Sequence, residues 1–451
     1  MSIDFKAFCR VFSALLLAVL PTAVLADGSA ESTTILRFQQ DTHAGFQTRT
    51  MVPLTEFFGV DADGAGDGNL SAHLYGWGRL DLADHNSAYN GGEGVNGALD
   101  YAYLQYRFKQ ANATARAGRF SIMEGILNEQ VDGVSYRSDL PYGFGVSSFG
   151  GANVHSAKII GAHTDGKGDG IFGGRINYRK GGLLELGISG VYESDAPTVS
   201  SPNFLPGTFG NHRLVGADIW LRPLDAMQIS GHTSYNTETG RVAEHSYLLQ
   251  VTPVKDLVLT VNYDEQHDRD FFYSSLLFAD MVRNLNQNSR AAGGSATYTL
   301  PGNVELSGDY KHYRRDIGQA DRFGGELRGN FLDKTLKGGF DYHYLRSSAD
   351  FAIVAIAGAS GSYHEARAWA MRDTASYFAS LDLIGYFFKK QVEGKDTAWE
   401  SVGSLGYHVT PRLSVSGDLS YGQSAQYDDE LKGLLRLTYN LELPGKGDLK
   451  R

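Results

Sequence analysis

The sequence predicts an all-β fold, a closed antiparallel transmembrane β-barrel of about 18–20 strands with short periplasmic turns and long extracellular loops. Three observations predict it. Apolar and polar residues alternate along most of the chain, prolines fall between the alternating runs, and short turns alternate with long polar connections. A barrel strand has one face toward lipid and one toward the lumen, and this arrangement produces a period of two.

Residues 1–26 are expected to form a cleaved secretory signal peptide. Lys6 and Arg10 precede an apolar stretch, and small residues lead to Ala26. Cleavage would leave 425 of the 451 residues and remove Cys9, the single cysteine. The segment carries two basic residues and one acidic residue, so the net charge would change from −10 to −11. The alternative is an uncleaved anchor helix, but the apolar run is shorter than a membrane span requires.

The alternation is clear in the hairpin at 171–193. Phe172, Ile176 and Tyr178 occupy even positions, whereas Arg175 and Arg179 occupy odd ones. Helical spacing does not fit such a pattern. The same unit recurs around short turns at 223–225, 253–256, 301–303, 333–335 and 411–412.

Aromatic residues give an independent indication of a membrane barrel. A tyrosine on the apolar face follows many of the short turns by a similar number of residues, as expected for an aromatic girdle at one depth. A soluble β-sandwich or β-helix is the alternative, but it gives no reason for this repeat. The residues are Tyr192, Tyr235, Tyr263, Tyr310, Tyr342 and Tyr421.

The expected organisation has four parts. After the signal peptide, 27–69 form an N-terminal strand and loop segment, 70–441 the barrel, and 442–451 a polar C-terminal tail. The parity of strands between 350 and 390 stays open. A barrel of this size leaves a lumen instead of a core filled by side chains.

The face opposite the apolar one carries both signs of charge. We expect neighbouring strands to pair opposite charges across a wetted wall. The residues are Arg175, Arg179, Glu185, Asp218, Arg222, Glu244, Glu305, Asp309, Lys311, Glu326, Arg328, Lys337, Asp341, Lys432 and Arg436.

Several classes of function are disfavoured. An exported, acidic chain has no electrostatic case for binding nucleic acid. The sequence has no Cys-x-x-Cys-His, so no haem or other cofactor is expected in this chain, and no catalytic motif such as HExxH or G-x-S-x-G, so we expect no enzyme. The loop 61–69 offers several oxygen atoms but lacks the bidentate glutamate of a complete calcium loop. Calcium binding there stays open, and no metal site is assigned.

The segment 117–134 differs from the repeating pattern. A strand ends in Gly118-Arg119, passes through a short glycine-containing excursion and returns through Asp132-Gly133-Val134. This arrangement resembles the early strands of porin-type barrels, where the segment leads toward the constriction. The candidate constriction residues are Arg119, Glu124, Glu129 and Asp132.

The first 150 residues also resemble a narrower group. The segments 33–41, 76–81 (Gly-Trp-Gly-Arg-Leu-Asp) and 101–108 are similar to the porin-like barrels that metal-reducing bacteria pair with multihaem c-type cytochromes. The resemblance implies an insulating sleeve around a partner cytochrome, with haem reaching the complex only through that partner. The polar end of the chain departs from the terminal aromatic residue of common barrels.

Two functions of different class follow, both in the bacterial outer membrane. The first is a porin-like channel with a polar lumen, in contact with lipid and lipopolysaccharide. The alternative is a sheath for a cytochrome in a transmembrane electron-transfer conduit, with periplasmic and outer-surface multihaem cytochromes as partners. A third reading, an adhesin or receptor acting through the long outer loops, has less support.

Overall fold

A computed structural model of the protein describes residues 27–43, 49–65, 68–83, 95–154, 170–196, 210–238, 240–267, 288–315, 318–348, 361–392, 394–424 and 427–443. Nearly all of these residues are in β-strands, and the helices are two single turns, η2 (Lys109–Ala111) and η3 (Pro141–Gly143). Within these ranges no helix is long and apolar enough to cross a membrane. The predicted signal peptide lies outside the described residues.

The strands follow one another along the chain and form one antiparallel sheet. In chain order they are β1 (Asp27–His43), β2 (Arg49–Met51), β3 (Pro53–Ala65), β4 (Leu70–Asp81), β5 (Val95–Phe108), β6 (Ala113–Glu124), β7 (Leu127–Asp139), β8 (Phe144–Asn153), β9 (Gly170–Lys180), β10 (Leu184–Ala196), β11 (Gly210–Leu224), β12 (Met227–Asn236), β13 (Arg241–Val254), β14 (Leu257–Gln266), β15 (Ser289–Leu300), β16 (Val304–Arg315), β17 (Gly318–Phe331), β18 (Leu336–Ser347), β19 (Tyr363–Asp373), β20 (Tyr377–Val392), β21 (Lys395–Thr410), β22 (Leu413–Gln423) and β23 (Tyr427–Leu443).

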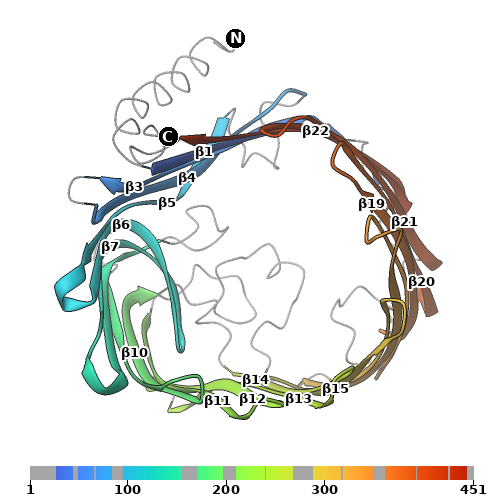
Figure 1. Ribbon diagram of the computed structural model, residues 1–451. Coiled ribbons are helices and arrows are strands. Elements are labelled where there is room, and N and C mark those ends of the chain that lie inside the picture. Colours follow the sequence, from blue (N-terminus) through green and yellow to red (C-terminus); the bar gives the residue numbers. More distant parts are fainter. Residues whose placement is uncertain are drawn as a thin grey trace.

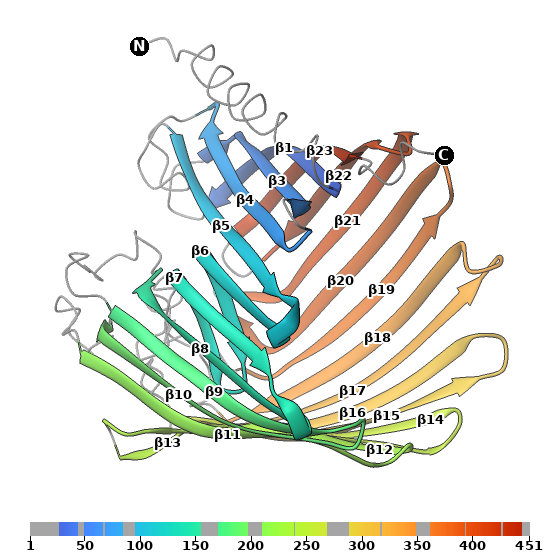
Figure 2. The same cartoon turned by 60° about the vertical axis from the view of Figure 1, so that its left-hand side comes forward.

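The first and last strands close the sheet into a barrel. β1 pairs antiparallel with β23 from Gly28 opposite Leu443 to His43 opposite Tyr427. β2 and β3 both pair with β1 and are separated only by Val52, so they act as one strand of the wall. The barrel therefore has 22 strands. Figure 1 shows the closed ring, and Figure 2 shows its strands running obliquely around the wall.

The strand number corrects the sequence expectation. The region from β4 onward holds 20 strands, the upper end of the expected range, and β19 and β20 resolve the parity between 350 and 390. The two further strands lie in 27–65, which was expected to be a separate N-terminal segment. Their sequence alternates poorly, as in Phe57-Phe58. Pairing with β23 on one side and β4 on the other nevertheless places them in the wall, which begins at Asp27.

The turns at 181–183, 301–303 and 411–412 are short and lie at one end of the barrel, as predicted. The expected alternation with long loops holds only in part, because connections of two residues also join β6 to β7 and β20 to β21 at the other end. Pro301 and Pro411 lie in these turns, whereas Pro223 and Pro253 are the penultimate residues of β11 and β13, beyond a shift of register. Most of the long connections lie outside the described residues.

The two faces of the wall differ as the alternation predicts. On β9 and β10 the outward Phe172, Ile176 and Ile188 are 60%, 64% and 71% exposed, whereas the inward Arg175 and Ser189 are 8% and 4% exposed. An outward belt of apolar side chains is the surface that lipid requires, and the polar groups are turned toward the lumen. The all-β barrel fold is confirmed.

Candidate channel constriction

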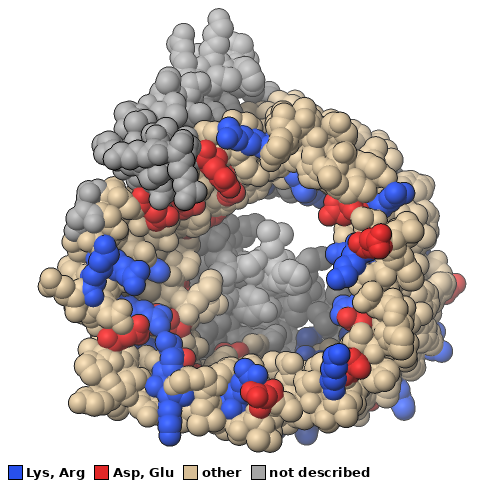
Figure 3. All heavy atoms as spheres, viewed as in Figure 1, with Lys and Arg blue, Asp and Glu red and all other residues tan. Residues whose placement is uncertain are grey.

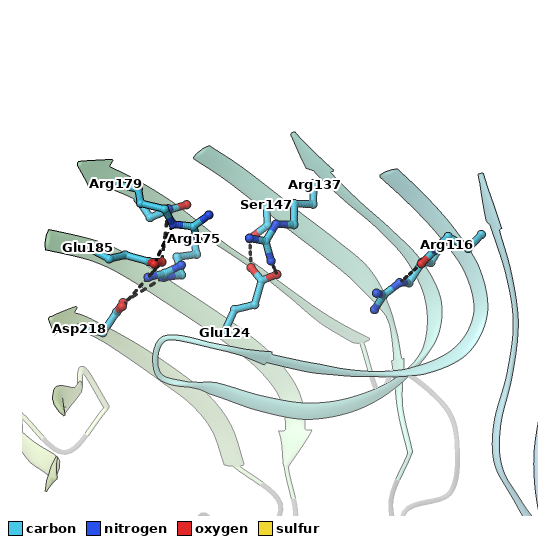
Figure 4. Close-up of polar contacts among 10 residues, drawn as sticks. Arg116, Glu124, Arg137, Ser147, Arg175, Arg179, Glu185 and Asp218 are labelled. Atoms are coloured by element: carbon cyan, nitrogen blue, oxygen red, sulfur yellow. Dashed lines mark hydrogen bonds and ion pairs between the residues drawn. The ribbon is translucent and has the colours of Figure 1, made fainter. Parts of the chain in front are cut away.

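The hairpin formed by β6 and β7 leaves the barrel wall. β5 pairs with β6 only up to Arg119, and the pairing of β7 with β8 begins at Val131. Between these points the two strands of the hairpin pair only with each other. Figure 4 shows this part of the hairpin lying in front of the wall strands, on the side of their charged residues.

A pair of glycines allows the bend. Gly118 and Gly133 lie directly opposite each other, and Gly118 has a φ of +128°. A Cβ atom on Gly118 would lie 2.2 Å from the carbonyl oxygen of Ala102, and one on Gly133 would lie 2.1 Å from that of Gly150. Only glycine fits such a close approach of backbones. The hairpin therefore turns inward where both of its strands lack a side chain.

An apolar underside holds the hairpin to the wall. Phe120 and Val131 are 1% and 0% exposed. Because burial of apolar surface is the main stabilising term in such a contact, the hairpin is anchored there and does not hang freely in the lumen. The buried cluster consists of Phe120, Ile122, Leu127 and Val131 from the hairpin, with Phe149, Ile171, Val191, Leu214 and Ala243 from β8 to β13.

The tip of the hairpin makes polar contacts with the wall. The backbone N–H of Ile126 donates to Ser189 Oγ at 3.3 Å. A Cβ atom on Gly125 would lie 2.7 Å from Asp218 Oδ2, so the glycine permits close contact with β11. Glu124 accepts hydrogen bonds from Arg137 at 2.9 Å and from the hydroxyl of Ser147. These polar contacts hold the tip against the wall, in addition to the buried apolar cluster.

The structure places the four predicted constriction residues on this hairpin, in three different settings. Arg119 and Asp132 form a bidentate pair at its base, with both N–O distances 2.7 Å, and Arg119 also donates to the carbonyl of Leu99 at 3.0 Å. Glu124 lies at the tip. Glu129 is half-buried on the same face as Leu127, away from the first pair.

A buried arginine lies beneath the tip. The guanidinium of Arg175 is 8% exposed and contacts Asp218 at 2.5 Å and Glu185 at 2.9 Å. Glu185 also accepts a hydrogen bond from Arg179 at 2.9 Å. Figure 4 shows these residues on adjacent strands of the wall. One cation thus joins β9, β10 and β11 at the place where Gly125 rests.

Opposite charges pair between neighbouring strands around the wall, as predicted. Arg328 contacts Glu305 on the adjacent strand at 2.5 Å. Figure 3 shows basic and acidic side chains interspersed around the ring. The inner wall therefore carries charged groups of both signs. Further pairs between adjacent strands are His232–Glu244, Arg322–Asp309 and Arg367–Asp382. Lys311–Asp264 and Lys432–Glu400 pair across one intervening strand.

Sequence reasoning missed the apolar patch on the inner wall and the roles of Arg116 and Arg137. Arg116 donates to Gln105 at 2.9 Å and lies over the ring of Tyr103. A signal for the patch was present, because consecutive apolar residues interrupt the alternation near the ends of β9, β10 and β11. The interrupting pairs are Ile171-Phe172, Val191-Tyr192 and Leu214-Val215.

In the segment 61–69, which could offer oxygen atoms to calcium, the first acidic residue contacts a histidine. Asp61 is 2.6 Å from His73 Nδ1 on the adjacent strand. Residues 66 and 67 lie outside the described residues, so calcium binding at 61–69 stays an open prediction.

The comparisons agree on the fold. No family model and no curated protein matches the sequence. Among solved structures, the chain resembles a variant of the ferric enterobactin receptor PfeA from Pseudomonas aeruginosa in complex with enterobactin, with a TM-score of 0.59, 10% identity and coverage of 92% of this chain and 82% of the receptor. The siderophore receptor PirA from the same organism gives a TM-score of 0.56, 12% identity and coverage of 92% and 80%.

A likeness at this level of identity establishes the architecture alone. The chain has the fold of a large outer-membrane β-barrel protein, and this fold supports an integral location in the outer membrane.

Proposed function

We propose that the protein is a diffusion channel for small polar solutes whose lumen is narrowed by the β6–β7 hairpin. The observation that carries the proposal is the anchored hairpin, with the charged pair of Arg119 and Asp132 at its base. A 22-strand barrel is wider than the 16–18-strand barrels that leave open aqueous channels, so an inward element is needed to restrict it. The mixed-sign wall suits polar solutes of either charge.

The same hairpin favours a channel over a cytochrome sheath. A sheath needs a lumen in which another folded protein can fit, whereas here a buried apolar cluster keeps the hairpin inside the barrel. The proposed channel requires no haem and no cytochrome partner. Its only constant partners are the lipids and lipopolysaccharide around the outward belt.

Conductance in planar bilayers tests the proposal. The purified protein should conduct ions, and a silent bilayer contradicts a channel. In a second variant, residues 120–131 are replaced by Asn-Gly, a two-residue turn that joins the paired positions Arg119 and Asp132. Its conductance should exceed that of the native protein. The double variant Glu305→Gln/Arg328→Gln, which removes a pair on another part of the wall, should leave conductance near the native value.

Purification from native membranes separates the channel from the sheath. A haem stain of the intact complex should show no c-type cytochrome with the barrel under the proposed function. Stoichiometric recovery of a multihaem cytochrome, together with loss of conductance in the complex, would instead favour the electron conduit.

A further inference from the structure

A second group of titratable side chains lies on the inner wall, outside the hairpin region. Asp309 on β16, Gly324 on β17, His343 on β18 and Glu365 on β19 occupy one row of the sheet, each opposite the next. Asp341 is two residues before His343 on β18 and therefore points to the same face. The row brings one imidazole and three carboxylates together from strands spread over more than 50 residues.

The imidazole of His343 is oriented by one of these carboxylates. Its Nε2 lies 3.2 Å from Asp309 Oδ1, and a carboxylate can only accept, so Nε2 carries the hydrogen. Its Nδ1 is buried and has no hydrogen-bond partner among the described residues. This nitrogen is 3.8 Å from Asp341 Oδ1 and 3.8 Å from Glu365 Oε1, too far for a hydrogen bond to either.

Gly324 makes room for this orientation. A Cβ atom at Gly324 would lie 2.1 Å from Asp309 Oδ1 and 2.2 Å from His343 Cδ2. The contact between the carboxylate and the imidazole passes directly over the glycine. Any other residue would push the two side chains apart, so this arrangement depends on the absence of a side chain at one position of the wall.

The basic side chain that acts on Asp341 and Glu365 makes its hydrogen bonds to another acid. Arg367 lies opposite Asp341 in the sheet, but its guanidinium is hydrogen-bonded to Asp382. In the described part of the chain, Asp341 and Glu365 have no ion pair other than the long contacts with His343. Their side chains are only 12% and 17% exposed. Two shielded carboxylates without a close donor are costly unless a cation joins them.

We propose that Asp341, His343 and Glu365 bind a divalent transition-metal ion. The ligands are His343 Nδ1 and one carboxylate oxygen from each acid, and Asp309 holds the ring in the required tautomer. A carboxylate that accepts from the distal N–H of a metal-bound histidine is the usual outer partner of such sites. One nitrogen and two oxygens suit ions of borderline hardness such as Zn²⁺, and three protein ligands leave a position for water.

The geometry is close to what coordination requires. The three donor atoms lie within 4.8 Å of one another. Ligands about 2.1 Å from a shared ion are separated by about 3–3.5 Å. Small rotations of the two carboxylates close this difference while Asp309 continues to hold the imidazole.

Titration of the purified, EDTA-treated full-length protein with Zn²⁺ tests the site. Calorimetry and metal analysis should give one ion per chain. His343→Ala should weaken binding by about 100-fold or more, because one of three ligands is lost. Asp309→Asn should weaken it by about 10–100-fold through the orientation of the ring alone. The matched control is His232→Ala, which removes an inward histidine that pairs with a single carboxylate, Glu244, and should leave binding unchanged.

Two further variants keep the test decisive if His343→Ala fails to fold. Glu365→Gln preserves shape and removes one ligand charge. Gly324→Ala pushes Asp309 and the ring of His343 apart while all three ligand residues are kept. Both should weaken Zn²⁺ binding in a folded barrel. The absence of stoichiometric binding in the native protein, or equal affinity in the native and Glu365→Gln proteins, would overturn the metal site.

Discussion

Arg119 and Asp132 face each other across the β6–β7 hairpin and are joined by two hydrogen bonds of 2.7 Å. The pair lies next to the glycines that allow the bend, at the base of the part of the hairpin that has left the wall. Its side chains are 29% and 46% exposed, so they remain in contact with water. At this place the pair contributes little stability. In the proposed channel its charges act on passing ions.

Neutralising one member of the pair should change ion selectivity. Arg119→Ala leaves the charge of Asp132 uncompensated and should favour cations, whereas Asp132→Asn should favour anions. A unit charge about 4 Å from an ion in water is worth about 1 kcal/mol, so the permeability ratio should change by roughly two- to five-fold. Reversal potentials across a salt gradient measure the ratio. The double variant Arg119→Ala/Asp132→Asn should return toward native selectivity, and unchanged potentials in both single variants would place the pair outside the ion path.

Side chains at the bend should be poorly tolerated. Gly118→Val and Gly133→Val each place a Cβ atom about 2 Å from a backbone oxygen, so the strands must move apart. We expect a loss of about 1–3 kcal/mol in the free energy of unfolding, measured by denaturant titration in detergent. Gly403→Ala is the control, since no atom lies within 4 Å of a Cβ at that position. Equal stability of all three proteins would mean that the bend does not depend on glycine.

The buried apolar face of the β6–β7 hairpin should determine whether the hairpin stays packed against the barrel wall. Phe120→Ala removes a fully buried ring and should weaken the packing of the hairpin against the wall by about 3–5 kcal/mol. A cysteine introduced at Val131, which is 0% exposed, should then react faster with a water-soluble maleimide. Met123→Ala on the same hairpin is the control, because Met123 is 75% exposed. Labelling that is equally slow in both backgrounds would contradict an anchored hairpin.

The sequence predicted the barrel, its two faces and the pairing of opposite charges, because a period of two follows directly from the backbone of a strand. At β9 and β10 the outward residues Phe172, Ile176 and Ile188 are exposed as expected. It predicted a closed barrel, but neither the full strand number nor the pair of strands that closes it. The place of β1 depends on its pairing with β23, a contact between the two ends of the chain that no local pattern contains.

The candidate site was predicted only in part for a similar reason. The glycine-containing segment at 117–134 contains the hairpin that leaves the wall. The direction of its bend depends on the apolar patch formed by Ile171, Val191 and Leu214, which come from three strands. No sequence pattern indicated the row of Asp309, Gly324 and His343, because the register between strands determines which of these residues lie opposite each other.

Removing the buried cation beneath the hairpin tip should destabilise the barrel more than removing an exposed one. Arg175→Gln leaves the carboxylates of Glu185 and Asp218 without their shared partner in a shielded place, and should cost about 3–5 kcal/mol. Arg328→Gln is the control, because its side chain is 50% exposed and its pair with Glu305 should contribute at most about 1 kcal/mol. Denaturant titration in detergent measures both.

Adding Asp218→Asn to Arg175→Gln should recover part of the lost stability, because it removes one of the uncompensated charges. If Arg175→Gln proved no more destabilising than Arg328→Gln, water in the lumen would be screening the buried group as effectively as the exposed one. Because Gly125 contacts this cluster, loss of the Arg175 side chain should also make the hairpin tip more mobile. Larger fluctuations of the single-channel current would show this.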